Sequence, residues 1–187
     1  MALGTVSKLL ELKDVKIAPL TADPEGGSAT YGTSVDIPGI VSLGIKPDVV
    51  KKELEGDNRV LDIWTKIKAI EIDFEHAKLS LDALKIMLGG TVTAAGTTPN
   101  QTQTYSLTAN DKPGYFKLEG QVVYVEEGLG DVHFVAYKCL ADDPPNWEVS
   151  DQSGDFATVK GKATAIPRNA DSKIFDIVFN ETAAPIS

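Results

Sequence analysis

Hydrophobic and polar residues alternate strictly within one seven-residue segment, residues 69–75. One side of the extended chain receives only large apolar side chains and the other receives only carboxylates: Ile70, Ile72 and Phe74 against Glu71, Asp73 and Glu75. Alternation with a period of two is typical of a half-buried strand. We therefore predict a strand here, with one face in a core and the other in water.

The polar face of this strand has two interpretations. Neighbouring carboxylates on one face repel one another, so the stability of a single strand gives little reason to place three of them in a row. The face is either an ordinary solvated sheet surface or an acidic strip on a surface that must not retain a polyanion. Its residues are Glu71, Asp73 and Glu75.

The strand pattern continues upstream, but its phase is reversed. Large side chains share one face at Leu61, Ile63, Thr65 and Ile67, which have the parity opposite to that of Ile70. A change of parity within one strand requires an extra residue or a crossing between two sheets. We expect this irregularity near Lys68.

A short helix is predicted directly after the strand, over residues 80–89. Ser80 is a suitable N-cap, and Asp82 lies in the first turn, where the helix dipole favours an anion. One apolar stripe recurs at helical spacing, at Leu81, Leu84 and Leu88. Gly89 ends the pattern, and a helix of about two turns has to pack on the sheet to persist.

Further strands are predicted wherever apolar segments alternate with turn residues. These strands cover residues 12–19, 33–46 with an interruption at Pro38-Gly39, and 91–95. Two hairpins are expected, one joining residues 115–125 to 132–140 and the other joining 156–166 to 173–179.

The intervening segments are predicted to be loops or arms. Residues 96–103 are small and polar, and the prolines within residues 142–146 argue against a continuing strand. Residues 47–58 are polar without a clean period, which predicts a long excursion of functional importance. Residues 1–10 and 181–187 are expected to be N-terminal and C-terminal arms.

Seven to nine strands and one helix, without alternation of the two, favour a mainly β protein. We predict a single domain over residues 1–187: an antiparallel β-sandwich or open barrel with one short flanking α-helix. A length of 187 residues is sufficient for a sizeable core, and the composition is ordinary, with 42% hydrophobic and 24% charged residues.

Charge and cysteine content narrow the classes of function. The net charge is −9, with only small basic groups at Lys51-Lys52 and at Lys66 and Lys68. This distribution argues against direct binding to nucleic acid. The single cysteine, Cys139, cannot form an intramolecular disulfide and is expected in a buried strand. No signal segment or long apolar run is visible, which favours synthesis in a cytosol.

No residue pattern points to catalysis, a metal or another cofactor. The two histidines, His76 and His133, lack partners at a metal-site spacing. A hard cation on the acidic strip would need ligands from neighbouring strands as well. We therefore predict no enzymatic activity, expect Trp64 in the core, and consider Trp147 either a core residue or part of a subunit contact.

The order of these elements resembles the major tail tube protein of long-tailed, non-contractile (siphovirus-type) bacteriophages. The resemblance covers residues 12–179 and involves LKDVKIAPLTADP (12–24), GIVSLGIKPDVVKKELEGDN (39–58) and AIEIDFEHAKLSLDALKIMLGG (69–90). The segments GYFKLEG and HFVAYKCLA, followed by the last predicted hairpin, resemble the closing half of these proteins.

The resemblance implies a structural role in the virion. Proteins of this family form hexameric rings that stack into a tube, and each subunit contributes a sheet to a continuous inner β-barrel with the helix outside it. The resemblance implies that the loop at residues 47–58 and the N-terminal arm contact the next ring. The polar loop residues concerned are Asp48, Lys51, Lys52, Glu53, Glu55 and Asp57.

The same resemblance implies the partners and the location of the protein. Its partners would be further copies of itself, a tape-measure protein, a tail terminator and distal tail or baseplate proteins, with no membrane. Assembly would take place in the host cytoplasm, and the product would be the virion tail. Viral DNA would pass through the lumen on ejection without specific binding.

Size and charge agree with a conduit for duplex DNA. Six subunits with four lumen strands each would give a barrel with a backbone diameter on the order of 48 Å. Six copies of a chain with a net charge of −9 carry −54 per ring, and an acidic wall repels phosphates and lets DNA slide. Glu71, Asp73 and Glu75 are the candidate lumen residues. Pairing around a ring would also cover open strand edges.

Two other functions remain open at this stage. A secretion-system tube protein of the type VI kind shares the ring architecture, and the sequence separates the two poorly. A monomeric β-sandwich binding or adhesin module belongs to another class, and it would be expected to show clustered exposed aromatic residues. The five tyrosines and two tryptophans here are not clustered in the sequence.

Overall fold

The computed structural model describes residues 6–123, 129–147, 149 and 157–186. Within these ranges the chain forms eleven strands and one helix, so the predicted mainly β class with one short helix is confirmed. The elements are β1 (Glu11–Ala22), β2 (Thr30–Tyr31), β3 (Val35–Asp36), β4 (Ile40–Gly56), β5 (Arg59–His76), α1 (Leu81–Leu88), β6 (Thr91–Ala95), β7 (Thr102–Ser106), β8 (Phe116–Val123), β9 (Asp131–Trp147), β10 (Val159–Ala165) and β11 (Phe175–Asn180).

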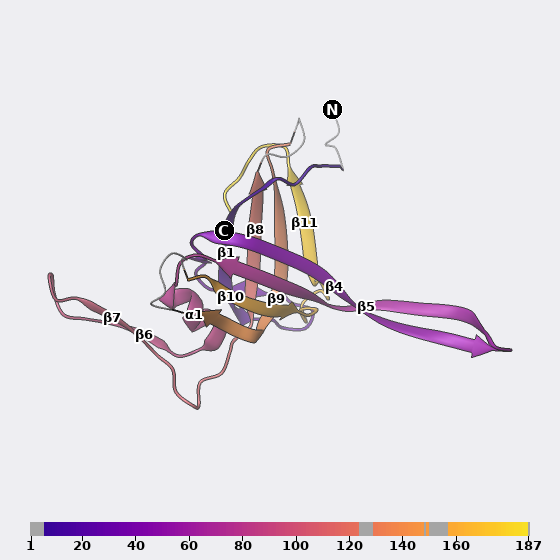
Figure 1. Cartoon of the computed structure of the whole chain (residues 1–187), viewed down its shortest axis with the longest axis horizontal. Coiled ribbons are helices and arrows are strands. Elements are labelled where there is room, and N and C mark those ends of the chain that lie inside the picture. Colours follow the sequence, from indigo (N-terminus) through magenta and orange to yellow (C-terminus); the bar gives the residue numbers. More distant parts are fainter. Residues whose placement is uncertain (1–5, 124–128, 148, 150–156, 187) are drawn as a thin grey trace.

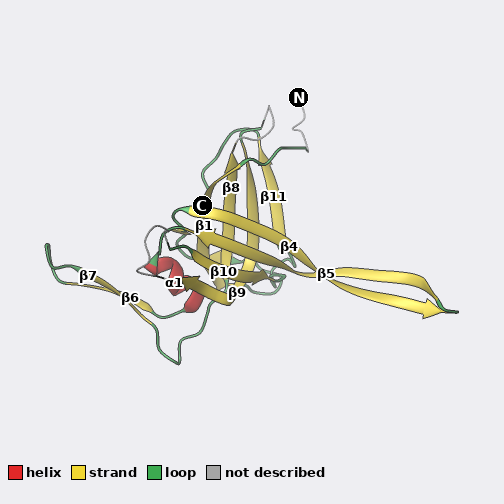
Figure 2. Ribbon diagram, in the orientation of Figure 1, coloured by secondary structure: helices red, strands yellow, loops and turns green. Residues whose placement is uncertain are grey.

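Nine of the strands form one antiparallel sheet, in the order β2-β1-β8-β9-β10-β5-β4, with β3 beside β1 and β11 beside β9. The sheet is strongly bent and does not close into a barrel. Figure 1 shows β8 and β11 running steeply in the view while β4 and β5 cross below them. Two hairpins project from this body in opposite directions, β4–β5 and the separate pair β6–β7 (Figure 2).

The core lies inside the bend of the sheet, with the helix against it. Its largest fully buried side chains include Ile17, Ile72, Phe116 and Leu118, and Met87 contributes from α1. The helix begins after Ser80, whose hydroxyl accepts a hydrogen bond from the Ala83 amide at 3.3 Å, and it ends before Gly89 at a φ of 82°. The predicted helix and both of its caps are confirmed.

The alternation that predicted the half-buried strand is confirmed in β5. Ile70, Ile72 and Phe74 are buried, while Glu71 and Asp73 are exposed and Glu75 is half-buried. Phe74 packs over Gly161 of the neighbouring β10, where an added Cβ would lie 2.6 Å from the ring. The ring can therefore lie flat on the sheet only because this position is a glycine.

The predicted change of phase is also found, at the predicted residue. In the β4–β5 ladder Asp48 pairs with Ala69, and the next pair is Val49 with Ile67, so Lys68 is left without a cross-strand partner. An extra residue of this kind is a β-bulge, which reverses the facing of every side chain beyond it. The two halves of the hairpin therefore differ in phase.

The loop predicted at residues 47–58 is wrong. These residues form the distal half of β4 and a two-residue turn, because Gly56 pairs with Arg59 across Asp57 and Asn58. Both turn residues have positive φ, 49° and 57°, as the tight hairpin turn requires. Pro47 is tolerated because β4 is the last strand of the sheet and has one edge without a partner among the described residues.

The loop predicted at residues 142–146 is wrong for a related reason. Strand β9 continues through Pro144 and Pro145 to Trp147, and its pairing with β10 shifts twice in this region. Bulges of this kind accommodate residues that cannot donate to the ladder. The strand β7 was also missed, because its polar residues gave no apolar alternation, whereas the strand predicted at residues 91–95 is confirmed as β6.

Of the two predicted hairpins, only the first is found as a pair of neighbouring strands. β8 pairs with β9, but β10 and β11 do not pair with each other. They lie one after the other along the same strand, with β11 on residues 131–136 of β9 and β10 on residues 139–147. Residue 156 of the predicted second hairpin lies outside the described residues, as do residues 1–5 of the N-terminal arm.

The described part of the C-terminal segment is packed on the body and is not a free arm. Ile186 is buried, and its carbonyl accepts a hydrogen bond of 2.8 Å from Lys16 of β1. Cys139 is buried in β9, as predicted, but Trp64 is 51% exposed, so the prediction that it lies in the core is wrong. Trp147 is 43% exposed.

Candidate functional site

The distal hairpin, residues 49–67 of β4 and β5, is the most unusual surface of the molecule. It projects from the body as a two-stranded ribbon (Figure 1). Eight large apolar residues on it are between 37% and 60% exposed: Val49, Val50, Leu54, Val60, Leu61, Ile63, Trp64 and Ile67. An exposed apolar patch of this size indicates a surface that another molecule covers.

Apolar side chains are exposed on both faces of this ribbon. The ladder pairs Val49 with Ile67, which places these two side chains on one face together with Ile63. Trp64 has the opposite parity and pairs with Lys52, whose ammonium lies 5.9 Å from the centre of the indole ring. Val50 and Leu54 share that second face, through their pairs with Lys66 and Asp62.

The distal hairpin is electrically neutral, although the whole chain is strongly acidic. It carries four basic and four acidic residues, whereas the net charge of the chain is −9. Copies of an acidic protein repel one another at long range, so a neutral apolar projection is a suitable place for a contact between copies. The residues predicted to contact a neighbouring ring, Lys51, Lys52, Glu53, Glu55 and Asp57, all lie on this ribbon, and Asp48 lies at its base.

The acidic strip lies on the exposed face of β5, but the structure pairs each of its carboxylates with a lysine. Lys46 of β4 lies 3.1 Å from Glu71, and two lysines of β10 approach the other two carboxylates. The distances are 3.3 Å from Lys162 to Asp73 and 3.4 Å from Lys160 to Glu75. Cross-strand pairs of opposite charge offset the repulsion along β5, so sheet stability does account for three carboxylates in a row.

The face around the strip is therefore of mixed charge and not uniformly acidic. The pKa of Glu75 is lowered by a hydrogen bond with Thr158 and by the nearby Lys160. Asp143 and Asp142 of β9 extend the same face, and Asp142 accepts a hydrogen bond of 2.6 Å from Thr164. Asp48 lies on the same face of β4 as Lys46, so six carboxylates and three lysines share this surface, which leaves a negative excess.

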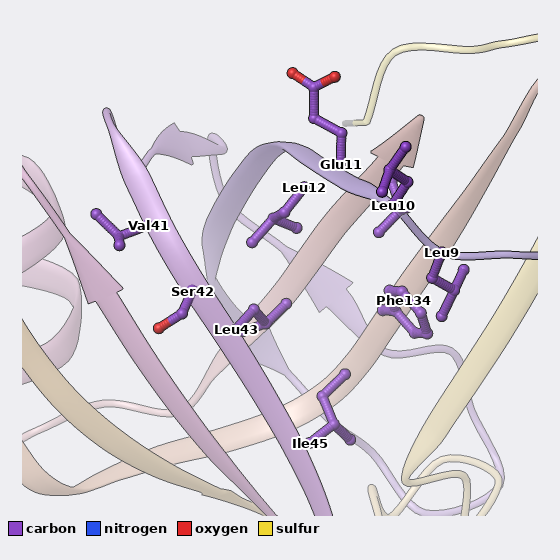
Figure 3. Close-up of a pocket in the computed structure, with 10 residues that line it drawn as sticks. Leu9, Leu10, Glu11, Leu12, Val41, Ser42, Leu43, Ile45 and Phe134 are labelled. Atoms are coloured by element: carbon purple, nitrogen blue, oxygen red, sulfur yellow. The ribbon is translucent and has the colours of Figure 1, made fainter. Parts of the chain in front are cut away.

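An apolar pocket of about 530 Å³ lies where the sheet fails to close, between residues 9–12 at the start of β1 and residues 41–45 of β4. We call it the seam pocket. Its main apolar lining comes from Leu9, Leu10, Leu12, Leu43, Ile45 and Phe134. Figure 3 shows Leu12, Leu43 and Phe134 pointing into the shared space, while Glu11 stands at the edge with its carboxylate directed outward.

A buried carboxylate, Asp131 at the start of β9, fixes the C-terminal segment to the body. It is fully buried and accepts hydrogen bonds from Gln121, His133 and the Ala184 amide, at 2.5, 3.1 and 2.9 Å, and from Asn180 at 2.7 Å. Burial alone would raise the pKa of Asp131, but these hydrogen bonds outweigh it and hold the pKa below its ordinary value of 3.8.

A second polar cluster joins the loop after β1 to the loop between β10 and β11. Asp23 accepts hydrogen bonds from Lys138 at 2.7 Å and from the Asn169 and Ala170 amides at 2.8 and 3.0 Å. Burial raises the pKa of Asp23, yet the hydrogen bonds prevail and the pKa is lowered. Asp23 and Asp131 thus have structural roles, because groups of this chain occupy their oxygens.

Neither histidine belongs to a metal centre in the part of the chain that the structure describes. No group of three or more His, Cys, Asp or Glu side chains there could hold a metal ion. His76 Nδ1 lies 2.6 Å from the Lys78 carbonyl, and burial lowers the pKa of the ring. His133 lies between Asp131 and Glu119, at 3.1 and 3.6 Å.

The described helix is also neither long nor apolar enough to span a membrane. The distal hairpin and the seam pocket are the candidate functional surfaces, because both expose apolar side chains. Sequence reasoning singled out residues 47–58 of the distal hairpin but predicted a loop for them. It missed the seam pocket, because the pocket joins residues 9–12 to 41–45 and to Phe134. No protein-family model matches the sequence, and no curated protein matches it either.

Proposed function

We propose that this protein is the repeating structural subunit of a siphovirus-type phage tail tube, assembled as stacked hexameric rings through which DNA enters the host cell. The observation that carries this proposal is the distal hairpin, with Trp64 and Ile63 about half exposed on opposite faces. A chain with such a projection is complete only when further copies cover it. The resemblance described above supplies the architecture in which that happens.

In this proposal the distal hairpin makes the contact between rings. Its polar residues Lys51, Lys52, Glu53, Glu55 and Asp57 lie on the ribbon together with the exposed apolar ones, and Asp48 lies at its base. Ring closure would bring the open edge of β4 against a neighbouring sheet, which protects it from uncontrolled pairing. The tape-measure, terminator and distal tail proteins would contact the ends of the tube and its interior.

The exposed face of β5 would line the bore, with Glu71, Asp73 and Glu75 toward the DNA. Lys46, Lys160 and Lys162 are held by these carboxylates, so they are poorly placed to bind phosphates. A wall of mixed charge with a negative excess offers a polyanion no continuous basic track. DNA would therefore pass without specific binding.

Negative-stain electron microscopy of the purified protein over a range of concentrations tests the proposal. Six-fold rings or hollow tubes are expected, in amounts that increase with concentration. The variant Trp64→Glu places a charge on the contact surface and should remain a folded monomer, whereas Ile177→Glu, at an equally exposed apolar residue of β11, should still assemble. A monomer at every concentration would overturn the proposal and favour a binding module.

A further inference from the structure

We propose that the Trp64 face of the distal hairpin docks into the seam pocket of a second copy of this chain. This inference rests on the proposed function, since it names the surface that receives the hairpin. The two surfaces are different parts of one chain, so the contact is head-to-tail. Contacts of this kind build rings or tubes, whereas a surface that pairs with itself stops at a dimer.

The first argument is the match of apolar surfaces. The Trp64 face presents Trp64, Leu54 and Val50, which are 51%, 60% and 37% exposed. The pocket offers about 530 Å³ lined mainly by leucine, isoleucine and phenylalanine, enough for several side chains. Tryptophan is enriched among the residues that dominate the binding energy of protein interfaces, and such residues lie in well-packed pockets.

The second argument is charge. Glu11 is the one charged side chain that lines the pocket among the described residues. On the Trp64 face, Lys52 lies opposite the tryptophan, and Lys66 and Asp62 lie on either side of it along β5, which leaves one net positive charge. Docking Trp64 in the pocket brings these two lysines toward the glutamate at its rim, and complementary charges fix the orientation of an interface.

The third argument is the amount of surface. The exposed apolar area of the eight hairpin residues, each about half exposed, is on the order of several hundred Å². A stable interface buries ~800 Å² on each partner, of which a little more than half is apolar. The distal hairpin can supply that share, with its second face against the same or a further neighbour.

The same strand provides both surfaces, which sets the spacing of the copies. Leu43 lines the pocket and Leu54 lies on the Trp64 face, and both belong to β4. Eleven residue steps along a strand span about 36 Å. Successive copies docked in the same orientation would therefore be displaced by about 36 Å along the direction of β4.

Fluorescence quenching of Trp64 tests the docking directly. The variant Trp147→Phe leaves Trp64 as the only tryptophan. Assembled particles are separated from the remaining monomers and compared with them. In the particles, quenching of Trp64 by iodide should be at least ~3-fold weaker than in the monomer. The emission of Trp64 should also shift to shorter wavelength, because an interface anchor is shielded from water. Assembled particles in which Trp64 is quenched as in the monomer would overturn the inference while leaving the proposed function intact.

A charge exchange tests the partner surface. Glu11→Lys should raise the concentration for half-maximal assembly about tenfold, and so should Lys52→Glu combined with Lys66→Glu. All three substitutions together should restore assembly to within ~3-fold of the starting protein. The controls are the substitutions Glu25→Lys and Lys112→Glu at exposed residues, which should leave assembly unchanged.

The outcomes separate the two proposals. Particles that form equally well with Glu11→Lys and with Glu25→Lys would refute docking in the seam pocket but not the tube. A starting protein that never assembles would refute the proposed function, and the docking with it. Thermal unfolding of each monomeric variant confirms that the substitutions act on assembly and not on folding.

Discussion

Strands β4 and β5 pair along their whole length, but the burial of their side chains differs between two halves. The proximal half comprises residues 40–48 and 69–76, and the distal half is the distal hairpin. In the proximal half, Ile72 and Phe74 are no more than 2% exposed, whereas in the distal half Ile63 and Trp64 are about half exposed. Backbone hydrogen bonds therefore determine the shape of the ribbon but not which side chains are buried. The proximal half contributes to folding of the monomer, and the distal half can bury its apolar surface only against another molecule.

The largest expected effect comes from truncating matched aromatic residues in the two halves. Phe74→Ala should lower the free energy of unfolding of the monomer by about 3–5 kcal/mol, because it leaves a cavity in the core. Trp64→Ala should lower it by less than ~1 kcal/mol, because the side chain is half in water already. Urea denaturation of both monomers measures the difference, and equal losses would contradict the division of the hairpin.

The buried carboxylate in the body provides the second contrast, because nothing comparable is described in the distal hairpin. Asp131→Ala removes the acceptor of four hydrogen bonds, and only Gln121 and His133 keep an alternative acceptor, the Ala184 carbonyl. The substitution should lower the free energy of unfolding by about 2–4 kcal/mol. The exposed Asp62→Ala in the distal hairpin should change it by less than ~0.5 kcal/mol. Chemical denaturation at neutral pH compares the two.

The lowered pKa of Asp131 also gives this contribution a defined pH dependence. A carboxyl whose pKa is lower in the folded protein than in the unfolded chain stabilises the fold above the unfolded value of 3.8. That stability is lost as the pH falls through the lower, folded-state pKa. Asp131→Asn should therefore show a shallower loss of stability between pH 5 and pH 2 than the starting protein, and an unchanged slope would contradict the assignment.

A smaller effect is expected at the turn of the distal hairpin. Asn58 has a φ of 57°, so Asn58→Gly relieves the backbone and should stabilise the ribbon by about 0.5–1 kcal/mol. Asn58→Ala should have the opposite sign, because alanine disfavours positive φ. Amide hydrogen exchange over residues 50–66 measures both, and the core amides of residues 70–74 serve as the internal control.

The smallest effect is expected on the exposed face of the proximal half. Lys162→Ala removes the partner of Asp73, but both side chains are more than half exposed. Solvent-exposed ion pairs contribute ~0–1 kcal/mol. The unfolding midpoint should therefore change little, and a loss of several kcal/mol would show that the pairing across β4, β5 and β10 is cooperative.

The proximal half could be predicted from the sequence because burial of one face leaves an alternating pattern. The strand and its inward face were predicted from Ile70, Ile72 and Phe74. The opposite parity of Ile67 predicted the bulge near Lys68. The helix after Ser80 was predictable from its caps. In each of these cases a local physical requirement fixes the residue type.

The β4 half of the distal hairpin could not be predicted in the same way, although residues 61–67 of β5 were predicted as part of a strand. Val49 and Val50 stand side by side on opposite faces, and polar residues follow them in a row, so no period of two remains in residues 47–58. Pro47 also suggested the end of a strand, although proline is compatible with the open edge of β4. An exposed strand with apolar residues on both faces therefore resembled a loop in the sequence.

Long-range pairings were likewise hidden. The neighbours of β10 are β5 and β9, and nothing local distinguishes these from the hairpin with β11 that the turn residues suggested. The seam pocket and the anchoring of the C-terminal segment by Asp131 join residues more than 50 positions apart. The lysines opposite Glu71, Asp73 and Glu75 became partners only through these pairings.

The bulge at Lys68 also makes the facing of side chains in the distal hairpin independent of their facing in the core. Deleting this one residue would put both halves of β5 into a single phase, so that either Glu71 and Asp73 would turn toward the core or the Trp64 face of the ribbon would rotate to the opposite side. Inserting or removing single residues at this position thus offers a lineage a way to re-aim the ribbon by half a turn while the core stays as it is.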